Sequence, residues 1–99
     1  MLIVVLGRGI LNIMRILLTT KIWKEGTHYI AYTPELDLSS QGKTEALAGK
    51  RLQHAIQLFF EETKRMGTFR EVMEAAGFLK DRNSWKAPQI SISSVEVAA

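Results

Sequence analysis

The spacing of apolar residues changes from the period of a strand to the period of a helix at Gly42–Thr44. Upstream of this point, β-forming residues gather in three runs, at 15–23, 28–33 and 36–41. A Gly-containing turn separates the first two runs, and Pro34 ends the second because proline cannot continue a central ladder. Sequential strands with short connections usually pair as neighbours, so these runs predict a three-stranded antiparallel meander.

Downstream of the change, the pattern predicts a long helix followed by a shorter one. Thr44 suits a helix N-cap, and Glu45 in the first turn suits the positive end of the helix dipole. One apolar face then recurs at helical spacing: Ala48, Leu52, Ala55, Ile56 and Phe59. A capping-box pattern at 68–71 starts the second helix, and Gly77 fits its left-handed stop.

The carboxyl-terminal part is expected to be a loop and then a strand. Residues 80–86 are polar apart from one tryptophan, and they read as a loop. Residues 89–97 contain β-branched residues that alternate with polar ones, with a slip of register near Ser93 and Ser94 that predicts a bulge. The fold class is therefore α+β: a three-stranded antiparallel meander packed against a helix, a second short helix and a C-terminal strand.

Residues 1–13 are expected to form an appendage to a single domain at 14–99. The segment is apolar and β-prone up to Leu6, and Gly7-Arg8-Gly9 then reads as a turn. It either adds a strand or packs against a partner chain. It lacks the charged start and cleavage site of a signal peptide and the about 20 apolar residues of a membrane span. We therefore expect no membrane association and a cytoplasmic location.

The chain has 99 residues and no cysteine, which excludes disulfides and thiolate chemistry. A domain this small without covalent staples must close its core well or share surface with a partner. We therefore expect a homo-oligomer, a dimer or higher. The net charge is +3, and the thirteen lysines and arginines are interleaved with ten carboxylates, with no run of five like charges. This pattern favours a solvated, mildly basic surface over a nucleic-acid interface.

A metal-dependent nuclease needs several converging carboxylates to hold its metal ions. The candidates are Glu35, Asp37, Glu45 and Asp81. The first two lie in a proline-bounded turn, the third fits a helix start and the last lies in a late polar segment. Turn and helix-end roles are therefore expected for them.

The remaining polar residues lack the spacing of a reactive site. His28 and His54 have no cysteine or HxxxH companion for zinc. No serine lies in a Gly-x-Ser-x-Gly elbow; the serines are Ser39, Ser40, Ser84, Ser91, Ser93 and Ser94. The Ser40–Thr44 segment lacks the first glycine of a phosphate loop. We expect no catalytic residues, no metal site and no cofactor.

The aromatic residues remain open between two roles. Trp23, Tyr29, Tyr32 and Trp85 could anchor a protein partner or fill the core. The sequence alone assigns no partner-binding residue.

The stretch from Gly26 to Phe59 resembles the HicB-like antitoxin family. The resemblance is carried by Glu25-Gly26, Tyr29-Ile30-Ala31-Tyr32, Pro34-Glu35-Leu36-Asp37, Ser40-Gln41-Gly42-Lys43-Thr44 and the helix positions Ala48, Leu52, Ala55, Ile56, Leu58 and Phe59. It implies a partial RNase H-like fold and a non-enzymatic role, neutralising a small HicA-type ribonuclease toxin by direct binding.

The chain departs from the longer family members after Gly77. Neither a helix-turn-helix nor a ribbon-helix-helix pattern follows there, so we do not expect this chain to bind operator DNA. Two alternatives remain open beside the antitoxin role: an orphan domain that only oligomerises, and a small metal-dependent nuclease.

Overall fold

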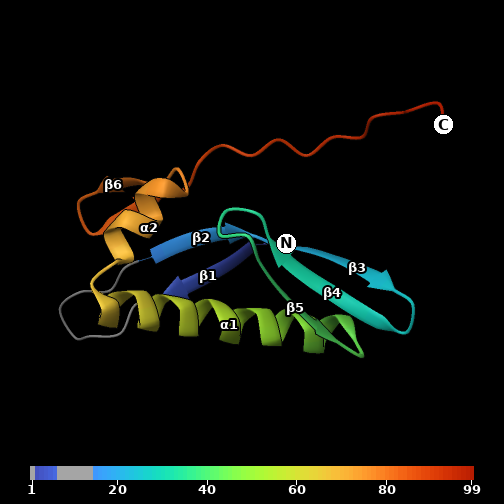
Figure 1. The fold of residues 1–99 in the computed structure, drawn as a ribbon, viewed down its shortest axis with the longest axis horizontal. Helices are drawn as coiled ribbons and strands as arrows, with labels where there is room; N and C mark the ends of the chain where they lie inside the picture. Colours follow the sequence, from blue (N-terminus) through green and yellow to red (C-terminus); the bar gives the residue numbers. More distant parts are fainter. Residues whose placement is uncertain (1, 7–14) are drawn as a thin grey trace.

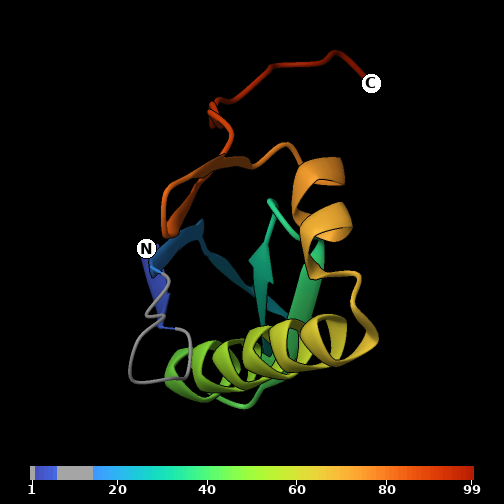
Figure 2. The same ribbon diagram turned by 90° about the vertical axis from the view of Figure 1, so that its left-hand side faces the viewer.

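The computed structural model describes residues 2–6 and 15–99, and it has the α+β fold that the sequence predicts (Figure 1). In chain order the elements are β1 (Leu2–Leu6), β2 (Arg15–Thr19), β3 (Lys21–Glu25), β4 (His28–Thr33), β5 (Leu38–Gly42), α1 (Glu45–Met66), α2 (Phe69–Ala75), β6 (Leu79–Asp81) and β7 (Ser84–Lys86). The long helix α1 lies across one side of the three-stranded sheet, and α2 and the β6–β7 hairpin lie over its C-terminal end, on the same side as the strands (Figures 1 and 2).

The predicted meander is confirmed as the antiparallel sheet β3-β4-β5. The β3–β4 hairpin turns at Gly26, whose φ of +58° is in the left-handed region that glycine adopts without strain. Strand β4 ends at Thr33, immediately before Pro34, as expected for a residue with no backbone N–H to donate.

The single strand predicted at 15–23 is wrong in one respect, because Thr20 divides it into β2 and β3, which belong to different sheets. Strand β4 stops at Pro34, so the chain before Lys21 has no partner there. The strand β1 pairs with β2 instead, antiparallel from Leu2 beside Thr19 to Leu6 beside Arg15. Residues 1–13 thus contribute a strand, one of the two expected roles. The turn at 7–9 and the boundary at Met14 lie outside the described residues.

Helix α1 begins as predicted, because the Thr44 side chain accepts a hydrogen bond of 3.0 Å from the Leu47 N–H. It ends at Gly67, which has a φ of +74°. Its buried face differs slightly from the prediction: Phe60 is buried, whereas Ala55 and Phe59 are only partly so. The buried positions shift gradually round the helix axis along α1, because one turn contains 3.6 residues and not a whole number.

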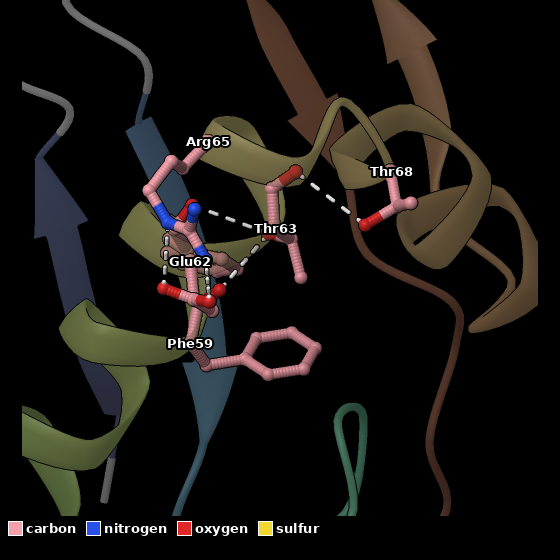
Figure 3. A network of polar contacts seen from close by, with 6 residues as sticks. Phe59, Glu62, Thr63, Arg65 and Thr68 are labelled. Atoms are coloured by element: carbon pink, nitrogen blue, oxygen red, sulfur yellow. Dashed lines mark hydrogen bonds and ion pairs between the residues drawn. The ribbon is translucent and has the colours of Figure 1, made fainter.

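The end of α1 buries a threonine within the apolar stripe (Figure 3). The Thr63 hydroxyl donates to the backbone oxygen of Phe59 at 2.9 Å, which satisfies a buried polar group inside the helix. On the exposed side of the same turn, Arg65 pairs with Glu62, and both side chains are largely in water. Such a surface pair adds little stability.

Helix α2 forms where predicted, but not with the predicted capping box. The Thr68 side chain makes no cap hydrogen bond and donates instead to the Thr63 carbonyl at 3.4 Å. The predicted stop is confirmed: Gly77 has a φ of +90°, and the Phe78 N–H donates to the Met73 carbonyl at 3.0 Å.

The loop predicted at 80–86 is wrong. Leu79 pairs with Lys86 and Asp81 with Ser84, so this segment is the short hairpin of β6 and β7. Its turn contains Arg82 at a φ of +55°, a conformation that no glycine marks in the sequence. The buried Trp85 ties the hairpin to the core.

The C-terminal strand predicted at 89–97 is also wrong for the single chain. Residues 87–99 have no strand assignment and leave the folded body as an extended segment (Figures 1 and 2). A strand needs a neighbour for its backbone hydrogen bonds, and no edge of the described chain lies beside this segment.

The core lies between the sheets, α1 and α2. Its buried hydrophobic residues are Ile16, Leu18, Ala31, Ala48, Leu52, Ile56, Phe60, Met73, Phe78 and Trp85. Gly42 lets β5 approach α1 closely, because a Cβ at that position would lie 2.8 Å from the Ala48 nitrogen.

Candidate protein-binding surface

The sheet β3-β4-β5 has one face against α1 and one face away from it. Ile22 points to the helix, since its Cδ1 lies 3.8 Å from where a Cβ on Gly49 would be, and Ala31 opposite it is fully buried. Side chains alternate between the two faces of a strand. Trp23 and Ile30, which are paired across β3 and β4, and Tyr32 therefore lie on the opposite side. We call Trp23, Ile30 and Tyr32 the outer face.

The outer face is an aromatic and apolar patch that remains partly in water. The Trp23 side chain is 40% exposed, and its ring meets the Tyr32 ring edge-on, with centroids 6.4 Å apart and planes at 71°. Ile30 and Tyr32 are half-buried. Neither belongs to the residues packed against the core cluster. Rigid aromatic side chains that are exposed beside an aliphatic one are typical of protein-binding surfaces.

Tyr32 is fixed in place by the turn that follows its strand. Its hydroxyl donates a hydrogen bond of 2.9 Å to Asp37 Oδ1. This hydrogen bond, with smaller effects of desolvation and of the Asp37 charge, raises the pKa of the Tyr32 phenol above its ordinary value. Asp37 has a φ of +53°, and its N–H donates to the Pro34 carbonyl at 3.3 Å. These hydrogen bonds therefore connect the turn to the outer face.

Glu35 anchors the same turn from the inside. Its Oε2 accepts a hydrogen bond of 2.6 Å from the Thr19 N–H, and the residue is only 8% exposed. The Oε1 atom is buried without a hydrogen-bond partner among the described residues, as are the hydroxyls of Thr20 and Thr33. Thr20 lies between β2 and β3, Thr33 ends β4, and Glu35 lies in the turn after β4. Buried polar side chains therefore occur at each of these three positions.

The candidate nuclease carboxylates are not gathered at one place. Glu35 is buried against β2, and Asp37 is exposed and bonded to Tyr32. Glu45 is exposed in the first turn of α1, and Asp81 is exposed at the end of β6. Among residues 2–6 and 15–99, no group of three or more histidine or acidic side chains could hold a metal ion.

The histidines and serines are likewise dispersed. His28 shares a hydrogen bond of 3.1 Å with the Thr27 hydroxyl at the hairpin turn, and His54 is exposed on α1. Ser84 donates to the Asp81 carbonyl within the β6–β7 turn at 2.9 Å. The others lie on β5 (Ser39 and Ser40) or on the extended C-terminal segment (Ser91, Ser93 and Ser94).

The structure separates the two tryptophans that the sequence left open. Trp85 is 4% exposed and packs edge-on against Phe69, with ring centroids 6.1 Å apart, so it belongs to the core. Trp23 belongs to the outer face. Tyr29 is half-buried against the core cluster, with the Lys24 amine 6.0 Å from its ring centroid. The sequence could have assigned Trp23 to the outer face, because side chains alternate along 15–23 and Ile22 lies on the inner side.

A second surface feature, which the sequence did not reveal, is an open hollow of about 530 Å³ between β2 and β7. Leu17 and Trp85 form part of its wall, and Arg15, Asp81 and Lys86 surround it. Its charges are of both signs, and its apolar wall is made by Leu17, Trp85 and Ala87. It offers no ordered set of polar groups that would select a ligand.

Comparisons with protein-family models, with curated proteins and with solved structures gave no match. Within the described residues, no helix is long and apolar enough to cross a membrane.

Proposed function

We propose that this chain is a protein-binding module of the HicB-like antitoxin kind, which neutralises a small HicA-type ribonuclease by covering its active site. One observation carries the proposal: the outer face presents Trp23, Ile30 and Tyr32 on a paired sheet. In the part of the chain that the structure describes, no cluster of acidic or histidine side chains that could hold a metal ion lies beside it. The segments that resemble the family supply β4, β5, the turn between them and most of α1, whereas Trp23 lies on β3, just before them. Occlusion needs affinity and no turnover.

The binding energy would come from local contact, not from long-range attraction. The chain has a net charge of +3, and ribonucleases that bind RNA are usually basic, so the two partners would not attract one another over a distance. An aromatic patch that loses water on binding provides the alternative. The hydrogen bond from Tyr32 to Asp37 fixes the ring beforehand, which lowers the entropy cost of association.

The first test is capture of the partner encoded beside this chain. A short basic neighbour should co-purify with it, and expression of this chain should restore growth to cells that the neighbour arrests. Failure of any neighbouring ribonuclease to bind would overturn the proposal.

The second test concerns the surface. Trp23→Ala should weaken the complex by at least about tenfold, as removal of a central aromatic anchor does. Leu58→Ala is the matched control, because Leu58 is also an exposed apolar residue (65%) but lies on α1. Equal binding by both variants would place the toxin elsewhere.

The proposed role implies a cytoplasmic location, where such a toxin would act, and it requires no DNA binding by this chain. It is also compatible with self-association of the chain.

A further inference from the structure

The segment at 89–97 keeps apolar side chains in water. Ile90 is 38% exposed, Ile92 64%, Val95 85% and Val97 74%. Between residues 89 and 97 the only charged side chain is that of Glu96. An extended, apolar and nearly uncharged segment of this kind is the pattern of a strand that pairs with another strand.

The chain's own body does not hold this segment. After β7 the chain passes Pro88, which lies close to Gly77, and then runs away from the sheets in both views (Figures 1 and 2). Every residue from 89 to 99 is exposed. The radius of gyration of 15.0 Å exceeds the about 13 Å of a compact domain of this length. The segment therefore extends beyond the domain.

The same chain offers an open edge of the right kind. Strand β3 is at the end of the order β3-β4-β5, so its second side has no strand partner among the described residues. An edge strand presents free N–H and carbonyl groups that accept another strand. Trp23 lies on this strand, exposed on the outer face.

The alternation of the two segments fits. If residues 89–93 run beside β3 with Ile90 and Ile92 on the side of Trp23, three apolar side chains lie together. The intervening Ser91 then lies on the side of Ile22 and Lys24, the side of the sheet that faces α1, where Lys24 is itself exposed. The added strand would widen the outer face without covering it.

We propose that residues 89–93, the first part of this segment, pair with the free edge of β3 in a second copy of this chain, and that the exchange is reciprocal. Each copy has an unpaired segment and an open edge at β3, so a two-fold dimer pairs both at once. Another protein would supply an edge for the segment but leave β3 open. The inference does not depend on the antitoxin role, and it is tested on this chain alone.

The first experiment measures the molar mass of the full chain by light scattering over a range of micromolar concentrations. The parent chain should be a dimer, and the double variant Ile90→Ser/Ile92→Ser should be a monomer with unchanged circular dichroism. Leu58→Ser is the matched control, since Leu58 and Ile92 are equally exposed (65% and 64%), and it should remain a dimer. A monomeric parent, or a double variant that remains dimeric, would overturn the proposal.

The second experiment identifies the two contacting elements, and the absence of cysteine makes it clean. Copies that carry Lys24→Cys are mixed, under a glutathione redox buffer, with tagged copies that carry Ser91→Cys or Ser93→Cys. A disulfide between the two kinds of chain should form with one of the serine positions, and not with the control Leu58→Cys. A chain that carries both cysteines and closes them only within itself would show that the segment docks on its own sheet, which also overturns the proposal.

Discussion

The Tyr32 hydroxyl donates a hydrogen bond of 2.9 Å to Asp37 across the proline turn that ends β4. This contact joins the outer face to the turn, and it involves two of the positions that carry the family resemblance. It also makes the ionisation of Tyr32 a measure of whether the turn is intact.

The pKa of Tyr32 should fall when Asp37 is changed to asparagine. The Asp37 carboxylate accepts a hydrogen bond from the neutral phenol, and its negative charge opposes formation of the phenolate. The pKa of Tyr32 in the folded state therefore lies above the unfolded value of about 10. This contribution to stability is present below pH 10 and is lost as the pH rises through the folded pKa. Absorbance titration of the phenol in a Tyr29→Phe background, which leaves Tyr32 as the only tyrosine, measures the midpoint directly. Equal midpoints with and without Asp37→Asn would contradict the hydrogen bond.

Two glycines should respond to alanine with opposite signs. A Cβ on Gly42 would lie 2.8 Å from the Ala48 nitrogen, which is backbone and cannot turn aside, so Gly42→Ala should cost about 1–3 kcal/mol of unfolding free energy. A Cβ on Gly49 would lie 3.8 Å from Ile22 Cδ1, which is an ordinary van der Waals contact. Because Gly49 lies inside α1, Gly49→Ala should raise the free energy of unfolding by up to about 1 kcal/mol. Urea unfolding of the two variants measures both. The same sign for both would mean that α1 does not cross β5 as described.

Glu35 should prove to be a structural residue. Glu35→Ala leaves the part-buried Thr19 N–H without its acceptor, so the free energy of unfolding should fall by about 1–3 kcal/mol. Glu74→Ala, which removes an exposed partner of Arg70, should cost only about 0.5 kcal/mol.

The nuclease alternative makes a different forecast for the same residue. A carboxylate that holds a divalent ion would give the parent chain a melting temperature that rises with millimolar Mg²⁺, and Glu35→Ala would remove that rise. For a structural glutamate, Mg²⁺ should leave both melting temperatures unchanged. A rise in the parent alone would favour the nuclease.

Local patterns were enough to predict the centre of the fold. The hairpin at Gly26, the stop at Pro34, the cap at Thr44 and the stripe on α1 each depend on residues close together in sequence. The failures depend on distant partners. Thr20 divides a continuous pattern only because β1 replaces β4 as the neighbour. The segment at 89–97 has the pattern of a strand but no edge of its own chain to join.

The candidate surface was partly visible in the sequence. The strand alternation places Ile22 inside and Trp23 outside, so the exposed tryptophan could have been assigned. Trp85 could not, because its burial depends on the β6–β7 hairpin, which has no glycine or proline to mark its turn. The anchor of Glu35 on Thr19 was also beyond prediction, since it joins positions on either side of the hairpin.

The two tryptophans should separate stability from binding. Trp85 is buried against Phe69, so Trp85→Ala removes a large core side chain and should cost about 3–5 kcal/mol, most of the stability of a domain at the lower end of the typical 5–15 kcal/mol. Trp23→Ala removes an exposed ring and should cost less than about 1 kcal/mol. Urea unfolding followed by circular dichroism gives both values. Because Trp23 is the solvent-exposed fluorophore, Trp23→Phe should also abolish most quenching by iodide, whereas Trp85→Phe should retain it. A Trp23→Ala chain that is as unstable as Trp85→Ala would make the outer face part of the core and leave it no role in binding.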